Sequence, residues 1–445
     1  MKTPICDFVA QYAKSNALRL HMPGHKGVAL LGMERMDITE IHGADSLYEA
    51  DGIIRESETN ASELFGAHTF YSTEGSSLCI RAMLYLASLH AGKGGGRIAA
   101  GRNAHKTFLS AAALLDLEVD WLYPRESASY LACKLSASDI EEYLNGAGER
   151  PVAVYLTSPD YLGNTADLKD IARVCHANGV LLLVDHAHGA YMKFLPVSRH
   201  PMDLGADLCC DSAHKTLPAL TGAAYLHVSQ SAPALFRDTA KQALAMFGST
   251  SPSYLILQSL DAVNGYLAEG YRERLAEFCR ATDGLKQRLA AAGYTLVGDE
   301  PLKITVLTKS YGYTGVAFSS ALEQKGIVCE FADPDFCVMM LTPEVGEEGL
   351  ARLEQALLSI PSKDPVVQAP PPLFRAERVL PIREAALTHS EEIPVEKSIG
   401  RILAVPTVGC PPAVPIVVCG ERITKEAIAC FDYYGIDTCR VVIKN

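Results

Sequence analysis

Between about residues 60 and 230, short apolar runs alternate with longer segments whose apolar residues recur at helical spacing. Several runs are apolar at successive positions, as in strands covered on both faces of a largely parallel sheet. We therefore predict an α/β doubly wound core. The predicted strands are 97–100, 119–123, 151–156, 180–185, 206–211 and 223–228, and the predicted helices between them are 76–92, 107–117 and 167–179.

The pattern changes after residue 254. A long helical stretch, roughly 254–293, leads into a smaller α/β unit with strands at 303–308 and 337–343 and helices at 314–326 and 346–360. The Pro-rich segment 361–372 predicts a linker, and the apolar run 413–420 predicts a strand in the C-terminal piece. The predicted domains are a large one over 1–260, a small α/β domain over 261–362, a linker over 363–375 and a C-terminal domain over 376–445.

Composition narrows the class of protein. The 445 residues are 48% hydrophobic and 21% charged, and no apolar run approaches the roughly 20 residues that cross a bilayer. No signal peptide is recognisable at the start of the sequence, and the 13 cysteines form no C-x-x-C pairs, which predicts free thiols and a cytoplasmic location. A net charge of −12 argues against a nucleic-acid partner.

Polar clusters follow the predicted strands where each strand ends. Ligands of open α/β sheets bind outside the carboxyl ends of the strands, so these clusters are expected to share one pocket. Five clusters qualify: "TEGSS" at 73–77, "GRNAHKT" at 101–107, "TSPDYLGN" at 157–164, "DHAHGA" at 185–190 and "SAHKT" at 212–216.

Each cluster also has an ordinary structural explanation. Gly75, Ser76 and Ser77 could simply cap a helix, although free N–H groups and the dipole at a helix start also bind phosphate. His186 and His188 lack a third ligand at a recognisable spacing, so we predict no metal site.

Together the clusters suggest pyridoxal 5′-phosphate (PLP), which needs a lysine for a Schiff base, a carboxylate for its pyridine nitrogen and an anion site for its phosphate. Asp185 supplies a carboxylate, and Ser76 and Ser77 supply an anion site. A dinucleotide would need a G-x-G-x-x-G turn, which is missing.

The tetrapeptide Ala-His-Lys-Thr occurs twice, so two lysines compete for the Schiff base. Lys106 leads directly into a predicted helix, whereas Lys215 follows Asp185 by one further strand and precedes a short Pro-containing turn. These features favour Lys215 without deciding the matter.

At this level of detail the chain resembles the ornithine/lysine/arginine decarboxylase family of fold-type I PLP enzymes, in the short form without an N-terminal wing domain. The resemblance covers nearly the whole chain. Its motifs are "HMPGHKG" (21–27), "DITE" (37–40), "TEGSS", "NAHKT", "SPDYLGNTADL", "VDHAHGA", "SAHKTLPALTG", "TSPSY" (250–254) and "SIGRILAVPTVGCPPAVPIVVCGERIT" (398–424).

The resemblance implies a PLP-binding large domain and a role for each matching residue. Lys215 would bind the cofactor covalently, and Asp185 would pair with the pyridine nitrogen. Ala187 and His105 would lie against the two ring faces, and His188 would reach the ring hydroxyl. The phosphate would be held by Gly75, Ser76, Ser77, Ser212 and His214, and Thr250 and Ser251 would reach the site from a partner subunit.

The resemblance also implies an activity: decarboxylation of lysine, ornithine or arginine to the amine and CO2, in polyamine-related metabolism, by a homodimer or higher oligomer. Lys215, His105, Asp185 and His214 would be the catalytic residues, with Lys215 or His214 returning the proton to Cα. Two alternatives remain: another fold-type I reaction, of the aminotransferase, aldolase or desulfurase type, and an inactive homologue with a binding role. The intact Lys215 and Asp185 argue against the second alternative.

Three positions depart from the family pattern. His186 replaces a common Glu, but strand alternation turns it away from the Asp185 side. Glu74 stands in the predicted phosphate turn (74–77), where a Glu is unfavourable beside a phosphate unless its side chain points away, and Gly222 replaces a frequent Gln. The acidic group for the distal cation of the substrate is not identified; the candidates are Glu40, Asp45 and Glu421.

Overall fold

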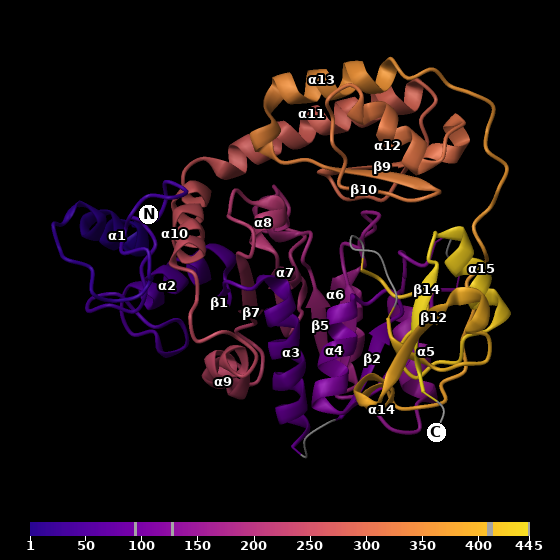
Figure 1. The fold of residues 1–445 in the computed structure, drawn as a ribbon, viewed down its shortest axis with the longest axis horizontal. Helices are drawn as coiled ribbons and strands as arrows, with labels where there is room; N and C mark the ends of the chain where they lie inside the picture. The colour runs from indigo at the N-terminus through magenta and orange to yellow at the C-terminus, as the bar shows by residue number, and fades with distance from the viewer. Residues whose placement is uncertain (93–95, 126–128, 407–412, 444–445) are drawn as a thin grey trace. The chain divides into compact units, whose positions relative to one another are not determined.

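A computed structural model describes residues 1–92, 96–125, 129–406 and 413–443 (Figure 1). The chain divides into two compact units. Unit 1 comprises Met1–His90 and Leu168–Leu275, and unit 2 comprises Ala91–Asp167 and Ala276–Asn445. The predicted division into three domains and a linker stays a prediction.

Unit 1 carries the strand ends on which most of the predicted site depends. Its elements are α1 (Pro4–Lys14), η1 (Leu47–Glu49), α2 (Ile53–Phe65), β1 (His68–Ser72), α3 (Gly75–Ala91, reaching one residue into unit 2), α6 (Leu168–Ala177), β5 (Leu181–Asp185), η2 (Ala190–Phe194), α7 (Pro201–Leu204), β6 (Leu208–Asp211), α8 (Ala213–Thr216), β7 (Ala224–Val228), α9 (Ala234–Ala245) and α10 (Tyr254–Ala268). The helix α11 (Tyr271–Ala291) begins in unit 1 and continues in unit 2.

The strands of unit 1 run in the order β1-β7-β6-β5. β5 and β6 are parallel, whereas β7 is antiparallel to both β6 and β1. Every residue of β5, β6 and β7 is buried, which explains their mostly apolar sequences and agrees with strands covered on both faces. A polar side chain in these strands is therefore an exception that needs a partner.

Unit 2 contains three groups of strands. Its elements are β2 (Gly96–Gly101), α4 (Lys106–Leu115), β3 (Leu117–Leu122), α5 (Ala137–Gly146), β4 (Ala153–Thr157), β8 (Leu296–Val297), β9 (Lys303–Leu307), η3 (Thr308–Tyr311), α12 (Gly315–Glu323), β10 (Phe331–Ala332), β11 (Phe336–Met340), η4 (Pro343–Val345), α13 (Gly346–Leu358), α14 (Ile382–Leu387), β12 (Ser390–Pro394), η5 (Val395–Lys397), β13 (Leu403–Val405), α15 (Lys425–Tyr433) and β14 (Thr438–Val442). The parallel strands run β4-β2-β3, and the two antiparallel sheets run β10-β11-β9-β8 and β12-β14-β13.

The α/β class and each strand predicted between residues 97 and 228 are confirmed. The helical stretch 254–293 is two helices, because Gly270 adopts a left-handed φ of +66° between α10 and α11. The predicted strand 413–420 is wrong: the segment is buried but irregular. Pro415 has no N–H for a ladder, and the carbonyls of Pro415 and Ile416 instead accept hydrogen bonds from Arg102.

Within the described ranges, no helix is both long and apolar enough to span a bilayer. The cysteines that the structure describes are all free thiols, as predicted.

Candidate active site

Lys215 lies on α8, a single helical turn that follows β6. Ser212 precedes this turn, and Leu217 ends it with an extended backbone. The turn directs Lys215 Nζ to within 2.9 Å of His188 Nε2. An ammonium group only donates hydrogen bonds, so a charged Lys215 makes Nε2 the acceptor and leaves the imidazole proton on Nδ1.

Asp185 is the last residue of β5 and is 3% exposed. Its register partner on β6 is Cys210, whose thiol donates to Asp185 Oδ1 at 3.7 Å. Burial raises the pKa of this thiol well above its ordinary value, so Cys210 remains a neutral donor. The main-chain N–H of Ala187 also donates to Asp185 Oδ1, at 3.3 Å. The carboxylate is thus held at a strand end, in the place that the sequence predicted.

The predicted phosphate turn lies where β1 leads into α3. Gly75 has φ +71° and donates its N–H to the carbonyl of Gly222 at 2.7 Å. Ser212 Oγ donates to Ser76 Oγ at 2.8 Å, so these two predicted phosphate ligands lie together. Ser77 is half-buried in the first turn of this 17-residue helix, where N–H groups without helical partners gather.

The Glu74 carboxylate is hydrogen-bonded to the backbone of another loop. Its Oε1 accepts the N–H of Ser249 at 2.6 Å, which ties the loop before α10 to the phosphate turn of the same chain. Thr250 and Ser251 in that loop are exposed, and their contribution to a partner subunit's site stays a prediction.

His214 is partly buried beside Lys215. Its Nδ1 lies 2.9 Å from the carbonyl of Ala223 and donates to it. Burial, helped by the neighbouring charge of Lys215, lowers the pKa of His214 below its ordinary value. The neutral ring therefore donates its single N–H to the backbone carbonyl, and its Nε2 carries no proton that it could donate.

His105 belongs to unit 2, where it caps α4 by accepting the N–H of Thr107 at Nδ1, 3.1 Å away. Its stacking on a cofactor held by Lys215 stays a prediction. Lys106 is exposed at the start of α4, whereas Lys215 is half-buried. This difference strengthens the preference for Lys215.

Two of the three acidic candidates for the substrate's distal cation are occupied by structural contacts. Asp45 accepts backbone N–H groups from Asp51, Gly52, Ile54 and Arg55 at the start of α2. Glu421 pairs with Arg102 and accepts the N–H of Val418. Glu40 is exposed and accepts from Thr39.

The departure at His186 has a structural partner that the sequence reasoning missed. His186 Nδ1 lies 2.6 Å from Asp211 Oδ1, on the face of the sheet opposite to the Asp185–Cys210 contact, as strand alternation predicted. Asp211 and His227 are polar residues in fully buried strands. This sequence pattern could have predicted that the two side chains have buried polar partners.

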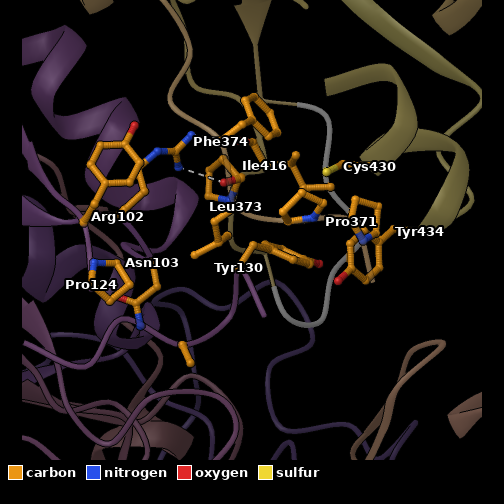
Figure 2. Close-up of a pocket in the computed structure, with 14 residues that line it drawn as sticks. Arg102, Asn103, Pro124, Tyr130, Pro371, Leu373, Phe374, Ile416, Cys430 and Tyr434 are labelled. Carbon is orange, nitrogen blue, oxygen red and sulfur yellow. Dashed lines mark hydrogen bonds between the residues drawn. The ribbon is translucent and has the colours of Figure 1, made fainter. Parts of the chain in front are cut away.

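Unit 2 also contains a cavity, lined by residues 102–103, 123–124, 130 and 132, by 371–374 of the Pro-rich linker, and by 415–416, 430 and 434 (Figure 2). Its walls are mostly aromatic side chains and prolines, among them Tyr130, Tyr434, Phe374 and Pro371. Among the lining residues that the structure describes, Arg102 is the one charged residue, and it donates to main-chain carbonyls. The described lining therefore offers neither the lysine nor the carboxylate that the predicted chemistry requires.

Two family models match most of the chain. Residues 3–297 match the major domain of the Orn/Lys/Arg decarboxylases, and residues 380–437 match their C-terminal domain. The uncharacterized protein YaaO of Bacillus subtilis strain 168 is 31% identical over 458 residues, covering 96% of this chain and 93% of its own. An arginine decarboxylase of the same organism is 30% identical, covering 96% and 92%.

Solved structures give the same fold. The lysine decarboxylase LdcF of Francisella novicida has a TM-score of 0.80 at 16% identity, covering 99% of this chain and 81% of that one. The constitutive lysine decarboxylase of E. coli has a TM-score of 0.78 at 18% identity, with 99% and 82% covered. On the match to both family domains, the chain belongs to the Orn/Lys/Arg decarboxylase family.

Proposed function

We propose that this protein is a PLP-dependent decarboxylase of a basic amino acid. The observation that carries the proposal is the contact between Lys215 Nζ and His188 Nε2, a histidine three residues after the strand-end carboxylate Asp185. A half-buried lysine on a neutral acceptor after β6, a buried carboxylate at the end of the neighbouring β5 and a serine-lined helix start make up the donor set that PLP requires.

The residues of unit 1 fit this cofactor. Asp185 would hold a proton on the pyridine nitrogen, and Lys215 would bind the cofactor covalently. Ser76 and Ser212 already hydrogen-bond each other, and their hydroxyls would turn to the phosphate with the N–H groups at the start of α3. Gly75, Ser77, Ala187, His188, His214 and, from unit 2, His105 complete the proposed set. Thr250 and Ser251 would come from a partner subunit.

When bound, PLP supplies an electron sink for the electron pair left at Cα after CO2 departs. Lys215 would then give a proton to Cα. His214 is the weaker donor, because its lowered pKa keeps it neutral and its N–H is bound to Ala223. His188 would accept one hydrogen bond from the Lys215 ammonium and so hold Nζ in place, which leaves another N–H of the ammonium for Cα.

Arginine is the first substrate to test, because two relatives that are 28% and 30% identical over most of their length are named arginine decarboxylases. Lysine and ornithine come next. We place the activity in cytoplasmic polyamine-related metabolism, in a homodimer or larger assembly.

The test incubates purified protein and PLP with each of the three amino acids, followed by mass spectrometry of the amine and measurement of CO2. Agmatine, cadaverine or putrescine with one equivalent of CO2 supports the proposal. Borohydride reduction should fix PLP on Lys215; Lys106→Ala should retain this labelling and Lys215→Ala should lose it. Labelling at Lys106, or consumption of the amino acid without CO2, would overturn the assignment.

A further inference from the structure

One buried carboxylate in unit 1 is surrounded by three histidines. Asp211 Oδ1 lies 2.6 Å from His186 Nδ1, and Asp211 Oδ2 lies 2.9 Å from His200 Nε2 and 3.1 Å from His227 Nε2. Asp211, His200 and His227 are 0% exposed and His186 is 1% exposed. The four side chains therefore have to satisfy one another without solvent.

The positions of the protons follow from the outer contacts of two rings. His200 Nδ1 accepts the N–H of Met202 at 3.3 Å, so its neutral ring carries the proton on Nε2 and donates it to Asp211. Thr69 Oγ1 lies 2.9 Å from His227 Nδ1, and a hydroxyl that donates there leaves the Nε2 proton of His227 for Asp211. With His186, the carboxylate accepts three N–H groups.

The charges agree with this arrangement. Burial lowers the pKa of His200 to about 4, so the ring is neutral at neutral pH. Burial opposes ionisation of Asp211, but its contacts with His200 and His186 hold the pKa of its carboxyl well below the ordinary value. Asp211 is thus a buried anion stabilised by hydrogen bonds from imidazoles.

A metal ion is the main alternative occupant. Ligand atoms of His200, Cys209, Asp211 and His227 all lie within 4.8 Å of one another, and this nitrogen, oxygen and sulfur set would suit Zn²⁺. A zinc ligand at His200 Nε2 would require the proton on Nδ1, where the Met202 N–H already points. The hydrogen-bonded arrangement avoids this conflict between two donors.

The cluster is joined to the cofactor site through adjacent residues. His186 directly follows Asp185, and Asp211 directly precedes Ser212, so their hydrogen bond connects the ends of β5 and β6. The N–H of His186 also donates to the carbonyl of Cys210 at 3.1 Å. A Cβ on Gly189 would lie 2.1 Å from His186 Nε2, so the ring also packs against the turn that carries His188.

We propose that Asp211 is a positioning residue: by accepting N–H groups from His186, His200 and His227, it fixes the strand ends that aim Asp185, His188 and Ser212 at the cofactor. This inference rests on the proposed PLP function. It predicts that the cofactor environment, beyond overall stability, depends on the Asp211 carboxylate.

The test compares Asp211→Asn with a matched control, Asp207→Asn, in protein prepared with PLP. Asp207 is also buried, borders β6 at its other end, and accepts from His176 and from the N–H of Leu182. Both variants should lose thermal stability. Only Asp211→Asn should weaken PLP binding, by about tenfold or more, and change the visible circular dichroism of bound PLP. Equal PLP affinity and identical spectra in the two variants would overturn the inference.

A second pair guards against misfolding of Asp211→Asn. His186→Asn keeps an N–H donor near the Nδ1 position, whereas His186→Leu removes it. His186→Asn should retain the wild-type spectrum and affinity, and His186→Leu should lose them. If both behave alike, the hydrogen bond to Asp211 does not position the site.

Two further outcomes are distinguishable. One equivalent of zinc in the purified wild-type protein, lost in Asp211→Asn, would replace this inference by a metal site. If the wild-type protein takes up no PLP, the proposed function fails and the inference fails with it; if the wild-type protein binds PLP and Asp211→Asn binds it equally well, only the inference fails.

Discussion

Glu421 Oε2 lies 3.3 Å from Arg102 Nη2. Arg102 stands three residues before His105 in the chain. Arg102 also donates to the carbonyls of Pro415 and Ile416, at 2.9 and 2.8 Å. The N–H of Lys106 donates to the carbonyl of Ala413. The loop that carries His105 is therefore held by the C-terminal part of the chain, within unit 2.

Replacing Arg102 should loosen this attachment. Arg102→Met leaves Glu421, only 3% exposed at its side chain, without its counter-charge, and breaking a buried pair costs about 3–5 kcal/mol. Denaturant unfolding should show this loss, with faster hydrogen exchange at residues 413–421. The matched control is Arg378→Met, whose partner Glu118 is half exposed, and it should cost about 0–1 kcal/mol. Similar losses in the two variants would contradict the prediction.

Gly222 should not tolerate a side chain. Its φ is +99°, and an added Cβ would lie 2.9 Å from the carbonyl oxygen of Thr73. Gly222→Ala should therefore destabilise the protein by more than the roughly 1–2 kcal/mol expected from the backbone conformation alone. Gly179→Ala is the control, because Gly179 has φ +68° and open space around the added atom. Thermal melting of both variants separates the steric clash with Thr73, present only in Gly222→Ala, from the backbone strain that both variants share. Equal decreases in melting temperature would show that Thr73 moves aside.

Acid should destabilise the fold through His200. Burial lowers its folded pKa from 6.5 to about 4, so between these values the unfolded chain binds a proton that the folded chain does not. The free energy of unfolding therefore falls as pH decreases across this window. The slope is at most that of one proton bound by the unfolded chain and not by the folded chain. Unfolding free energies measured from pH 7 to 4.5 should show this slope, and His200→Gln should flatten it. An unchanged slope in that variant would exclude His200 as the cause.

His188 should affect turnover more than cofactor content. His188→Ala removes the acceptor 2.9 Å from Lys215 Nζ and should lower kcat by about 10²–10⁴-fold while PLP remains bound. His188→Gln can place an amide oxygen near the Nε2 position and should recover part of kcat. Steady-state kinetics with the amino acid found active, alongside PLP quantitation, checks both variants. Equal activity in the Ala and Gln variants would show that accepting from Lys215 is not the function of His188.

The parallel strands were predictable because burial on both faces leaves an uninterrupted apolar run, as in residues 181–184 of β5. Asp185 was predictable for the same reason, since one carboxylate ends that run. The Asp211 cluster was not, because it depends on which strands are neighbours: Cys209 opposes His227 only through the antiparallel pairing of β6 and β7. The buried segment 413–420 misled the prediction, because apolar composition reports burial and not whether backbone groups form a ladder.

The two copies of Ala-His-Lys-Thr differ in local structure: the lysine of one begins the ten-residue helix α4, and the other copy forms the single turn α8. Trypsin normally cuts after an unmodified lysine. Because Lys106 and Lys215 stand in the same tetrapeptide, the protease meets the same local sequence at both sites. A borohydride-reduced PLP adduct would block cleavage at one copy and leave the other as its internal standard. The duplicated tetrapeptide thus lets a single peptide map of unmutated protein identify the modified lysine.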